Sequence, residues 1–447
     1  MDIVLALHQF PPFGGGGTEV LAGWITGSLR ARGHSVRLVS AVPHGATTAG
    51  LALPPDDVVR FLPLRRSDGS GAARIRREFD DADAGDAFGA VLDERRPDVV
   101  HFLHLAGLTA GAVRASIARG VPTVFTATDF WFECPTVQLL LCDHSRCAGP
   151  DLDRLNCARH LMELRHPALH ALSAVSLFDR PAALALRIAS RVPGLRRMTS
   201  SFEALAARSP TLHATLQSLG AVVAPTAHMR ERLASFGVPE GRLHLVRFGV
   251  PRPRVEDSAT ADRDPRGMRI AFVGTLASHK GPHLIVEALA RLQGIPLWLD
   301  LHGDSNDSEY CRRLQAATRA DGRIRLCGRF ASVEIGRVFH DADVLVIPSL
   351  WDENAPLVLL QAIAHRCPVL VSDVPGLVEP MREGLDGWTF RRNDVDDLAA
   401  VLRRLAADPE STARIRRTPV VTRSIDDQVA DLLSLYRNCG APAPVPQ

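Results

Sequence analysis

One lysine stands out in a chain that is otherwise rich in arginine. Of the 52 Lys and Arg residues in the 447-residue sequence, Lys280 alone is a lysine. It follows an apolar stretch at residues 270–273 and the turn residue Gly274, and it precedes Pro282, which is favoured at the first position of a helix. Because open α/β sheets bind anions between a strand end and a helix start, this pattern predicts that Lys280 contacts a phosphate-bearing ligand.

A second group of polar residues lies in the sequence PSLWDENAPLVLLQA, residues 348–362. Glu353 and Asn354 follow a strand expected at residues 344–347, and a helix is expected to begin at Pro356. The unpaired amides at that helix start can receive phosphate or sugar oxygens. Gln361 comes eight positions after Glu353, so we predict that a carboxylate and an amide contact the ligand bound by Lys280. The alternative is a solvated acidic turn with a surface glutamine.

The elements that position these residues alternate between strands and helices. In the first half, strands are expected at residues 3–7, 36–41, 58–62, 99–103, 123–126, 221–224 and 243–246, and helices at 18–32, 74–95, 109–118 and within 159–219. In the second half, strands are expected at residues 270–273, 297–302, 324–326, 344–347 and 369–371, and helices at 284–292, 309–319, 333–340, 356–365, 377–383, 394–406 and 425–437. Alternation of this kind predicts parallel sheets covered on both faces.

The length and the punctuation of the chain predict two domains. A polar, proline-bearing stretch at residues 251–267 is typical of a linker. We therefore expect an α/β protein with two doubly wound, Rossmann-like domains facing a central cleft. The first would comprise residues 1–250, with an irregular, cysteine-containing and helical insertion at about 130–220, and the second would comprise residues 268–420. Residues 421–447 are expected to form a helix that crosses back to the first domain, followed by a tail.

Composition excludes several classes of protein. Charged residues make up 23% of the chain and the net charge is +2, so no large basic field for nucleic acid is expected. No apolar run approaches the length needed to span a membrane. The first residues, MDIVLALHQFPPF, are typical of a strand rather than of a signal peptide. From these observations we expect a cytoplasmic protein.

Taken together, the motifs resemble those of family 4 retaining glycosyltransferases, which have the GT-B fold. The resemblance covers most of the chain. Its motifs are GGGTE at residues 15–19, PDVVHFLH at 97–104, DFWFECP at 129–135, APTAHMRERLASFGVP at 224–239, FVGTLASHKG at 272–281, ADVLVIPSLWDENAPLVLLQA at 342–362 and VSDVPGLVEPMREGLDGWTF at 371–390.

The resemblance implies a nucleotide-sugar donor and assigns residues to it. Lys280 would bind the donor diphosphate at the Gly274–Thr275 turn, and Glu353 would hold the donor sugar together with the backbone of Asn354, Ala355, Pro356 and Leu357. Gln361 would face the ribose, Arg329 and Phe330 would border the base, and Gly16 and Gly17 would let the backbone of the first domain approach the diphosphate. Transfer in this family retains the anomeric configuration and requires no divalent metal or other cofactor, because protein groups stabilise the departing diphosphate.

On the acceptor side, the resemblance indicates Asp129 as a catalytic carboxylate beside Lys280 and Glu353, with His104 as a weaker candidate. Three positions depart from the family pattern. Gln361 replaces a glutamate, Thr275 stands where an arginine is common, and Thr128 stands where many members have a histidine. We interpret these departures as altered specificity. The alternatives are a catalytically silent GT-B module that binds a nucleotide sugar or a partner enzyme and, less favoured, a nucleotide-sugar epimerase.

Four cysteines, Cys134, Cys142, Cys147 and Cys157, lie close together in the sequence. Their spacing matches no common zinc template, but clustering in a cytoplasmic protein favours a structural zinc over disulfides. The alternative is that they are ordinary core residues.

The acceptor is not identified by the sequence. Residues 177–198 mix apolar residues with five arginines, which is typical of a packed helix with a solvated face. The alternative is a patch that contacts anionic lipid at the inner face of the membrane and brings the enzyme to a lipid-linked acceptor.

Overall fold

A computed structural model of the chain describes residues 1–42, 46, 48, 51, 53–63, 71–151, 155–165, 196–253, 267–304, 308–330 and 334–439. In it the chain divides into two compact units. Unit 1 comprises Met1–Arg247 and Val429–Gln447, and unit 2 comprises Phe248–Gln428. The arginine-rich segment at residues 177–198, expected to be a packed helix with lipid contact as the alternative, falls almost wholly outside the described residues, as does most of the predicted linker. None of the described helices is both long and apolar enough to cross a membrane.

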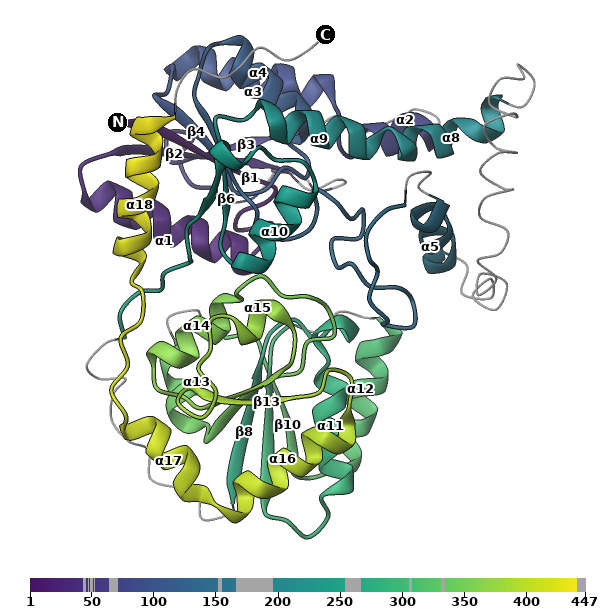
Figure 1. The fold of residues 1–447 in the computed structure, drawn as a ribbon, viewed down its shortest axis with the longest axis vertical. Coiled ribbons are helices and arrows are strands. Elements are labelled where there is room, and N and C mark those ends of the chain that lie inside the picture. The colour runs from purple at the N-terminus through teal and green to yellow at the C-terminus, as the bar shows by residue number, and fades with distance from the viewer. Residues whose placement is uncertain are drawn as a thin grey trace. The chain divides into compact units, whose positions relative to one another are not determined.

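Unit 1 contains a parallel sheet of seven strands among its described residues, in the order β3-β2-β1-β4-β5-β6-β7 (Figure 1). The strands are β1 Asp2–Leu7, β2 Ser35–Ala41, β3 Val59–Leu62, β4 Val99–Phe102, β5 Thr123–Thr126, β6 Ala221–Ala224 and β7 Leu243–Leu245. The helices are α1 Gly17–Ala31, α2 Gly71–Arg77, α3 Ala82–Arg95, α4 Thr109–Ala118, α5 Leu155–Arg165, α8 Arg196–Ala206, α9 Arg208–Ser218 and α10 Ala227–Ser235, with the 3-10 turn η3 at Glu240–Arg242. The interior strand β1 is buried from Ile3 to Leu7, as expected for a parallel strand covered on both faces.

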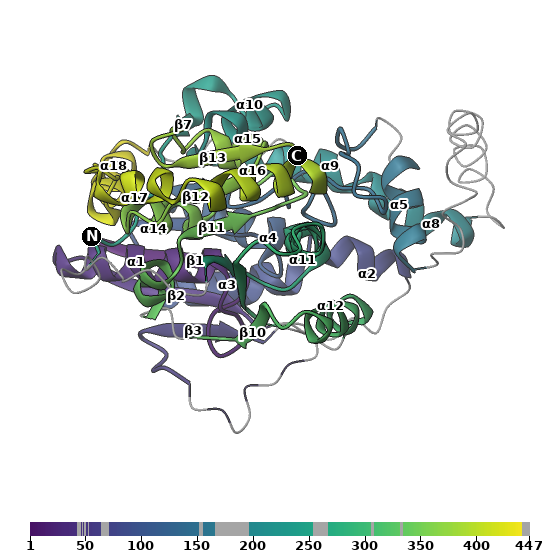
Figure 2. The ribbon, with the colours of Figure 1, turned by 90° about the horizontal axis from the view of Figure 1, so that it is seen from below.

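Unit 2 contains a parallel sheet of six strands among its described residues, in the order β10-β9-β8-β11-β12-β13. The strands are β8 Met268–Val273, β9 Leu297–His302, β10 Ile324–Gly328, β11 Val344–Ile347, β12 Val369–Ser372 and β13 Gly387–Phe390. The helices are α11 Pro282–Arg291, α12 Glu309–Ala320, α13 Ile335–Asp341, α14 Leu357–Ala364, α15 Pro375–Val378, α16 Val395–Ala407 and α17 Pro409–Arg417, and the 3-10 turn η5 is Ser278–Lys280. Helix α16 packs beside α11 (Figure 2).

The sequence predicted most of these elements, but it was wrong about one helix and missed three elements. The single helix expected at residues 74–95 is two helices, α2 and α3. The side chain of Asp81 accepts a hydrogen bond from the amide of Asp83 and begins a new helix there. Helix α10, strand β13 and helix α17 were not predicted. Strand β13 has only four residues, and the single apolar face of α17 is short.

The carboxyl-terminal helix α18, Ile425–Asn438, returns the chain to unit 1. Tyr436 on α18 is buried, and its hydroxyl lies 2.6 Å from Nδ1 of His101 on β4. The other ring nitrogen of His101 lies 2.7 Å from Oγ1 of Thr126 on β5. Both polar atoms of this fully buried imidazole are therefore satisfied, as expected for a histidine in the core.

We expect Tyr436→Phe to destabilise unit 1. The substitution keeps the ring but leaves one nitrogen of buried His101 without its partner, which costs about 1–3 kcal/mol. Differential scanning calorimetry checks this as a lower melting temperature. The matched control is Tyr310→Phe in unit 2, which removes a 2.9 Å hydrogen bond to a part-buried histidine, His283. An equal or larger decrease in melting temperature in the control would contradict the importance of the buried contact between Tyr436 and His101.

Candidate functional site

The predicted donor residues of unit 2 lie where the order of the strands reverses. Strand β8 is followed in sequence by β9 and β10 on one side and by β11, β12 and β13 on the other. Lys280 belongs to the loop after β8, and Glu353 belongs to the loop after β11. Since β8 and β11 are neighbours, both loops leave the sheet at the topological switch point, where open α/β sheets bind ligands.

Backbone contacts fasten these two loops to each other. Gly281 has a left-handed conformation, with φ of 70°, and it joins η5 to α11. A Cβ at this position would lie 2.1 Å from the carbonyl oxygen of Pro348, so only glycine allows the loops to approach so closely. The amide of Leu350 also donates a 2.8 Å hydrogen bond to the carbonyl of His279. The position of Lys280 relative to the Glu353 loop is thus set by the backbone.

Lys280 and Glu353 form an ion pair at the centre of this arrangement. The ammonium nitrogen of Lys280 lies 2.7 Å from Oε1 of Glu353, and the same oxygen accepts hydrogen bonds from the Ser349 hydroxyl at 2.5 Å and from the Trp351 indole at 2.8 Å. The Lys280 ammonium also lies 4.9 Å from the centre of the Trp351 ring. The Glu353 side chain is 4% exposed and that of Lys280 is 25% exposed. The carboxylate is therefore buried and three donors converge on its Oε1, whereas the Lys280 side chain is partly accessible from solvent.

The residues after Glu353 pack against the start of α15. The amide of Ala355 donates to the carbonyl of Gly376 at 3.2 Å, and Asn354 forms an isolated bridge with the same glycine. Ala355 itself has φ of 52°, a left-handed conformation that is costly for a residue with a side chain. Pro356 then caps α14, whose first residue is Leu357. The structure thus holds the predicted donor-sugar loop in one conformation.

The other predicted donor residues of unit 2 lie around this centre but outside it. Gly274 donates from its amide to the carbonyl of His302 at 3.0 Å, and Thr275 is exposed. Arg329 pairs with Asp304 at 2.9 Å on the surface. Phe330 packs edge-on against the His302 ring, with ring centres 5.6 Å apart. For these four residues a role in donor binding stays a prediction.

Gln361 lies in the second turn of α14 and is partly exposed. Within the described part of the chain, no hydrogen bond connects its side chain to Lys280 or Glu353. Its assignment to the ribose therefore also stays a prediction.

In unit 1 the acceptor-side candidates lie at the switch point of the other sheet. The strand order reverses between β1 and β4, and His104 follows β4 while Asp129 follows β5. His104 Nε2 lies 2.8 Å from Asp129 Oδ2, and Asp129 Oδ1 accepts a 2.9 Å hydrogen bond from the amide of Trp131. The hydroxyl of Thr128 donates to the carbonyl of Leu103 at 3.0 Å. An imidazole therefore contacts Asp129 although the position before it is a threonine.

Two further residues of this cluster were not predicted as site residues. The ring of His8, which follows β1, packs against the ring of His104 at a tilt of 42°, with ring centres 4.1 Å apart. His8 Nε2 lies 3.3 Å from Oε1 of the buried Glu19 on α1 without making a hydrogen bond. His8 lies directly after a strand, like the loop of Lys280, so the same sequence pattern could have identified it. The proximity of Glu19 to His8 could not be predicted in this way, because it depends on the direction in which α1 leaves the sheet.

Burial and neighbouring charge set the protonation of this cluster. Burial, reinforced by the charge of His104, lowers the pKa of His8 to about 3. His8 is therefore neutral near pH 7, and its contact with Glu19 is not a salt bridge. Burial acts to raise the pKa of Asp129, but the charge and hydrogen bond of His104 outweigh it, so the pKa of Asp129 falls below its usual value. Asp129 is thus held as a carboxylate.

Gly16 and Gly17 lie at the start of α1. Gly16 is the N-cap residue and Gly17 the first residue of the helix, and both are exposed. Their predicted contact with a diphosphate stays a prediction.

The four clustered cysteines are free thiols in the structure. Cys134 is buried and its sulfur lies 3.2 Å from the Thr136 hydroxyl, whereas Cys142, Cys147 and Cys157 are partly buried. Among the described residues, three or more possible metal ligands come within 4.8 Å of one another at Asp300, His302 and Cys327, and not at the four cysteines. The predicted zinc site is therefore not preformed. A structural zinc at the four cysteines stays a prediction.

The pKa values of two histidines predict acid sensitivity of unit 1. Burial lowers the pKa of His101, like that of His8, to about 3, against an ordinary value of 6.5. Below pH 6.5 the unfolded chain takes up protons at both rings while the folded unit does not, so the free energy of unfolding should fall as the pH drops from about 6.5 to about 3.

Calorimetry across that pH range measures this dependence. His8→Asn should reduce the slope, because asparagine does not titrate. His283→Asn in unit 2 is the control and should leave the slope for unit 1 unchanged. A pH-independent melting temperature for unit 1 between pH 6.5 and 4 would contradict the neutral, buried state of these rings.

Each half of the chain matches a known protein family. Residues 15–252 match the family described as Glycosyltransferase Family 4, and residues 256–418 match Glycosyl transferases group 1.

Curated relatives match less of the chain. The amylovoran biosynthesis glycosyltransferase AmsK of Erwinia amylovora is 26% identical over 40% of this chain and 45% of its own length. The D-inositol 3-phosphate glycosyltransferase of Mycobacterium marinum is 28% identical over 44% of this chain and 45% of its own. Glycogen synthase of Mycobacterium tuberculosis is 28% identical over 43% and 47%. The chain thus spans about half the length of the curated relatives it matches.

Solved structures resemble the whole chain. HepE of Anabaena in complex with UDP has a TM-score of 0.59 at 12% identity and covers 99% of this chain and 96% of its own. WaaG, a glycosyltransferase involved in lipopolysaccharide biosynthesis, has a TM-score of 0.56 at 17% identity and covers 97% and 96%. At these identities the likeness concerns the fold, which is the predicted two-domain GT-B fold. Since the family 4 match covers more than half of its residues, the chain belongs to glycosyltransferase family 4.

Proposed function

We propose that this protein is a retaining, metal-independent glycosyltransferase that moves a sugar from a nucleoside-diphosphate sugar to an acceptor. The observation that carries the proposal is the Lys280–Glu353 pair at the switch point of unit 2. Family membership and the UDP complex of HepE, a protein of the same fold, support a nucleotide-sugar donor.

Lys280 is suited to binding a diphosphate without a metal ion. An ammonium has three N–H donors, and one of them is used by Glu353. The other two can reach a phosphate from the solvent-exposed side of the group. The first amides of α14, at Leu357 and the residue after it, have no intrahelical acceptors and add positive potential at the same loop. As the bond to the sugar breaks, these groups stabilise the negative charge that develops on the departing diphosphate.

Glu353 is suited to orienting the donor sugar. Three donors converge on its Oε1, so this oxygen is fixed and the carboxylate is held in one orientation. The remaining oxygen, Oε2, can accept a hydrogen bond from a sugar hydroxyl. Because Lys280 and Glu353 contact each other, the groups for the diphosphate and for the sugar are positioned as one unit.

On the acceptor side we propose that Asp129 acts with His104. The missing histidine at position 128 was the reason to consider a catalytically silent module. In the structure His104 supplies an imidazole 2.8 Å from Asp129, which supports an active acceptor site. A silent nucleotide-sugar-binding module remains the second candidate because Gln361 and Thr275 also depart from the family pattern.

The acceptor belongs to one of three classes: a growing polysaccharide, a glycolipid or a small metabolite. The curated relatives include an amylovoran biosynthesis enzyme, a D-inositol 3-phosphate glycosyltransferase and a glycogen synthase, so their names do not single out one class. A lipid-linked acceptor with peripheral membrane contact remains the alternative interpretation of the arginine-rich segment at residues 177–198.

The donor site is tested with UDP-, GDP-, ADP- and dTDP-sugars by thermal shift and calorimetry. We expect one nucleotide to raise the melting temperature of the wild type. Lys280→Ala should lower the affinity for that nucleotide by about 10- to 100-fold, because a charge-assisted contact contributes about 1.5–3 kcal/mol to binding.

Two matched variants accompany this substitution. Lys280→Arg should also bind weakly, since a planar fork replaces a compact ammonium. Arg313→Ala removes an exposed arginine on α12 and should bind like the wild type. Wild-type affinity in folded Lys280→Ala would refute the assigned diphosphate site.

Retention is tested by NMR on the sugar released when the bound donor hydrolyses slowly in the absence of acceptor. We expect the first-formed anomer to keep the donor configuration, and we expect EDTA to leave the rate unchanged because Lys280 and the α14 amides replace a cation. An inverted anomer or an EDTA-sensitive rate would contradict the mechanism. Donor binding without hydrolysis, and without transfer to any acceptor offered, would favour the silent module.

A further inference from the structure

One face of the sheet in unit 2 is polar where strands β8, β9 and β10 lie side by side. Along β9, Leu299 and Leu301 are fully buried on one face, whereas Asp300 and His302 point to the other face. Parallel sheets normally carry apolar residues on both faces, so this polarity requires a cause other than packing.

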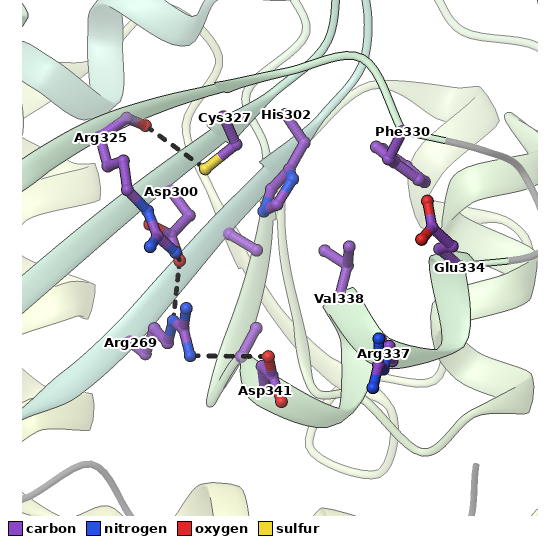
Figure 3. Close-up of a pocket in the computed structure, with 12 residues that line it drawn as sticks. Arg269, Asp300, His302, Arg325, Cys327, Phe330, Glu334, Arg337, Val338 and Asp341 are labelled. Carbon is purple, nitrogen blue, oxygen red and sulfur yellow. Dashed lines mark hydrogen bonds and ion pairs between the residues drawn. The ribbon is translucent and has the colours of Figure 1, made fainter.

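The polar face lines a cavity of about 470 Å³, with α13 forming the opposite wall (Figure 3). The cavity is lined by Arg269, Ala271, Asp300, His302, Arg325, Cys327, Phe330, Glu334, Arg337, Val338, Asp341 and Ala342.

Three side chains with metal-binding atoms converge on this face. A carboxylate oxygen of Asp300, a ring nitrogen of His302 and the sulfur of Cys327 all lie within 4.8 Å of one another. Asp300 and His302 are two residues apart on β9 and therefore share a face. Cys327 joins them from β10, where the pairing with β9 shifts register between Leu326 and Gly328. Irregularities of this kind re-aim side chains and are common beside functional sites.

Each of the three side chains has an atom available for a metal. The sulfur of Cys327 lies 3.9 Å from the carbonyl oxygen of Arg325 and also interacts with the guanidinium of that residue, but a sulfur atom has more than one lone pair. The His302 ring packs against Phe330. Asp300 Oδ2 accepts from Arg269 at 2.7 Å and from Arg325 at 3.0 Å, but Oδ1 accepts one bond, from Arg325 at 2.9 Å. A carboxylate oxygen has two lone pairs, so Oδ1 retains one.

The neighbouring charges tolerate a cation. Arg269 and Arg325 hold Asp300, and Arg269 also lies 3.7 Å from Asp341. With Arg337 and Glu334, three guanidinium groups face three carboxylates around the cavity, so the lining is close to neutral before a thiolate forms (Figure 3). The arginines also fix the orientation of Asp300, as hydrogen-bond partners of ligating carboxylates do.

We propose that Asp300, His302 and Cys327 bind a divalent cation of the zinc class, with the fourth position open to the cavity. Mixed sulfur, nitrogen and oxygen ligands favour zinc over magnesium or calcium. Ligand atoms around tetrahedral zinc lie roughly 3.3–3.8 Å apart, so the three side chains need to close by at most about 1.5 Å. The metal would fasten the edge strand β10 to β9. It is separate from the Lys280–Glu353 pair, which lies on the loops after β8 and β11, although Phe330, predicted to border the donor base, lines the same cavity.

The test uses the full chain, stripped with chelator and titrated with Co²⁺ and Zn²⁺. We expect about one Co²⁺ at this site, with a thiolate-to-cobalt charge-transfer absorption, and a higher melting temperature of unit 2 with Zn²⁺. Cys327→Ser should abolish the charge-transfer band. His302→Gln should keep the fold and lower the affinity for the metal by more than about tenfold.

Cys147→Ser is the matched control, because it changes one of the four clustered cysteines of unit 1. Loss of the band in this variant, with retention in Cys327→Ser, would assign the metal to that cluster and overturn the proposal. Absence of metal binding by the wild type would also overturn it. Donor binding, measured separately, should be the same in Cys327→Ser and the wild type, so the failure of either proposal can be recognised independently of the other.

Discussion

The buried carboxylate of Glu353 ties together the two loops that form the candidate donor site of unit 2. A charge removed from water is costly unless it is paired and hydrogen-bonded, and here an ammonium, a hydroxyl and an indole converge on one oxygen. Two of these donors, Ser349 and Trp351, come from the same loop, but Lys280 lies 73 residues earlier. The loops after β8 and β11 must therefore meet, and Gly281 permits the approach that this requires.

Unit 1 repeats the principle with different chemistry. At its switch point Asp129 is kept ionised by His104, and His8 is kept neutral by burial beside it. Unit 2 thus presents an accessible positive group, suited to a diphosphate, while unit 1 presents a carboxylate supported by imidazoles, suited to hydroxyl groups. This division matches a transferase that separates donor and acceptor chemistry between two Rossmann-like units.

The sheet of unit 2 carries different functional groups at the carboxyl ends of its strands and on one of its faces. At the carboxyl ends, loops carry Lys280 and Glu353. On the face, β8, β9 and β10 carry paired arginines and acids together with His302 and Cys327 above a cavity. The short helix α13 packs Phe339 into the core near β11 and leaves this polar part of the sheet open. A single sheet can therefore support two chemically independent sites.

The sequence by itself determined the alternating elements, the two-domain fold, and Lys280 and Glu353 as candidates, because strand ends and helix starts are local patterns. Asp129 became a candidate through the resemblance of its motif to those of the family. Tertiary structure alone decided that Lys280 contacts Glu353, and that His8 and Glu19 join the Asp129 cluster. It also brought Cys327 beside His302, and it did not bring the four clustered cysteines together. The physical reason is that strand order and register across a sheet depend on long-range pairing, which no local spacing specifies.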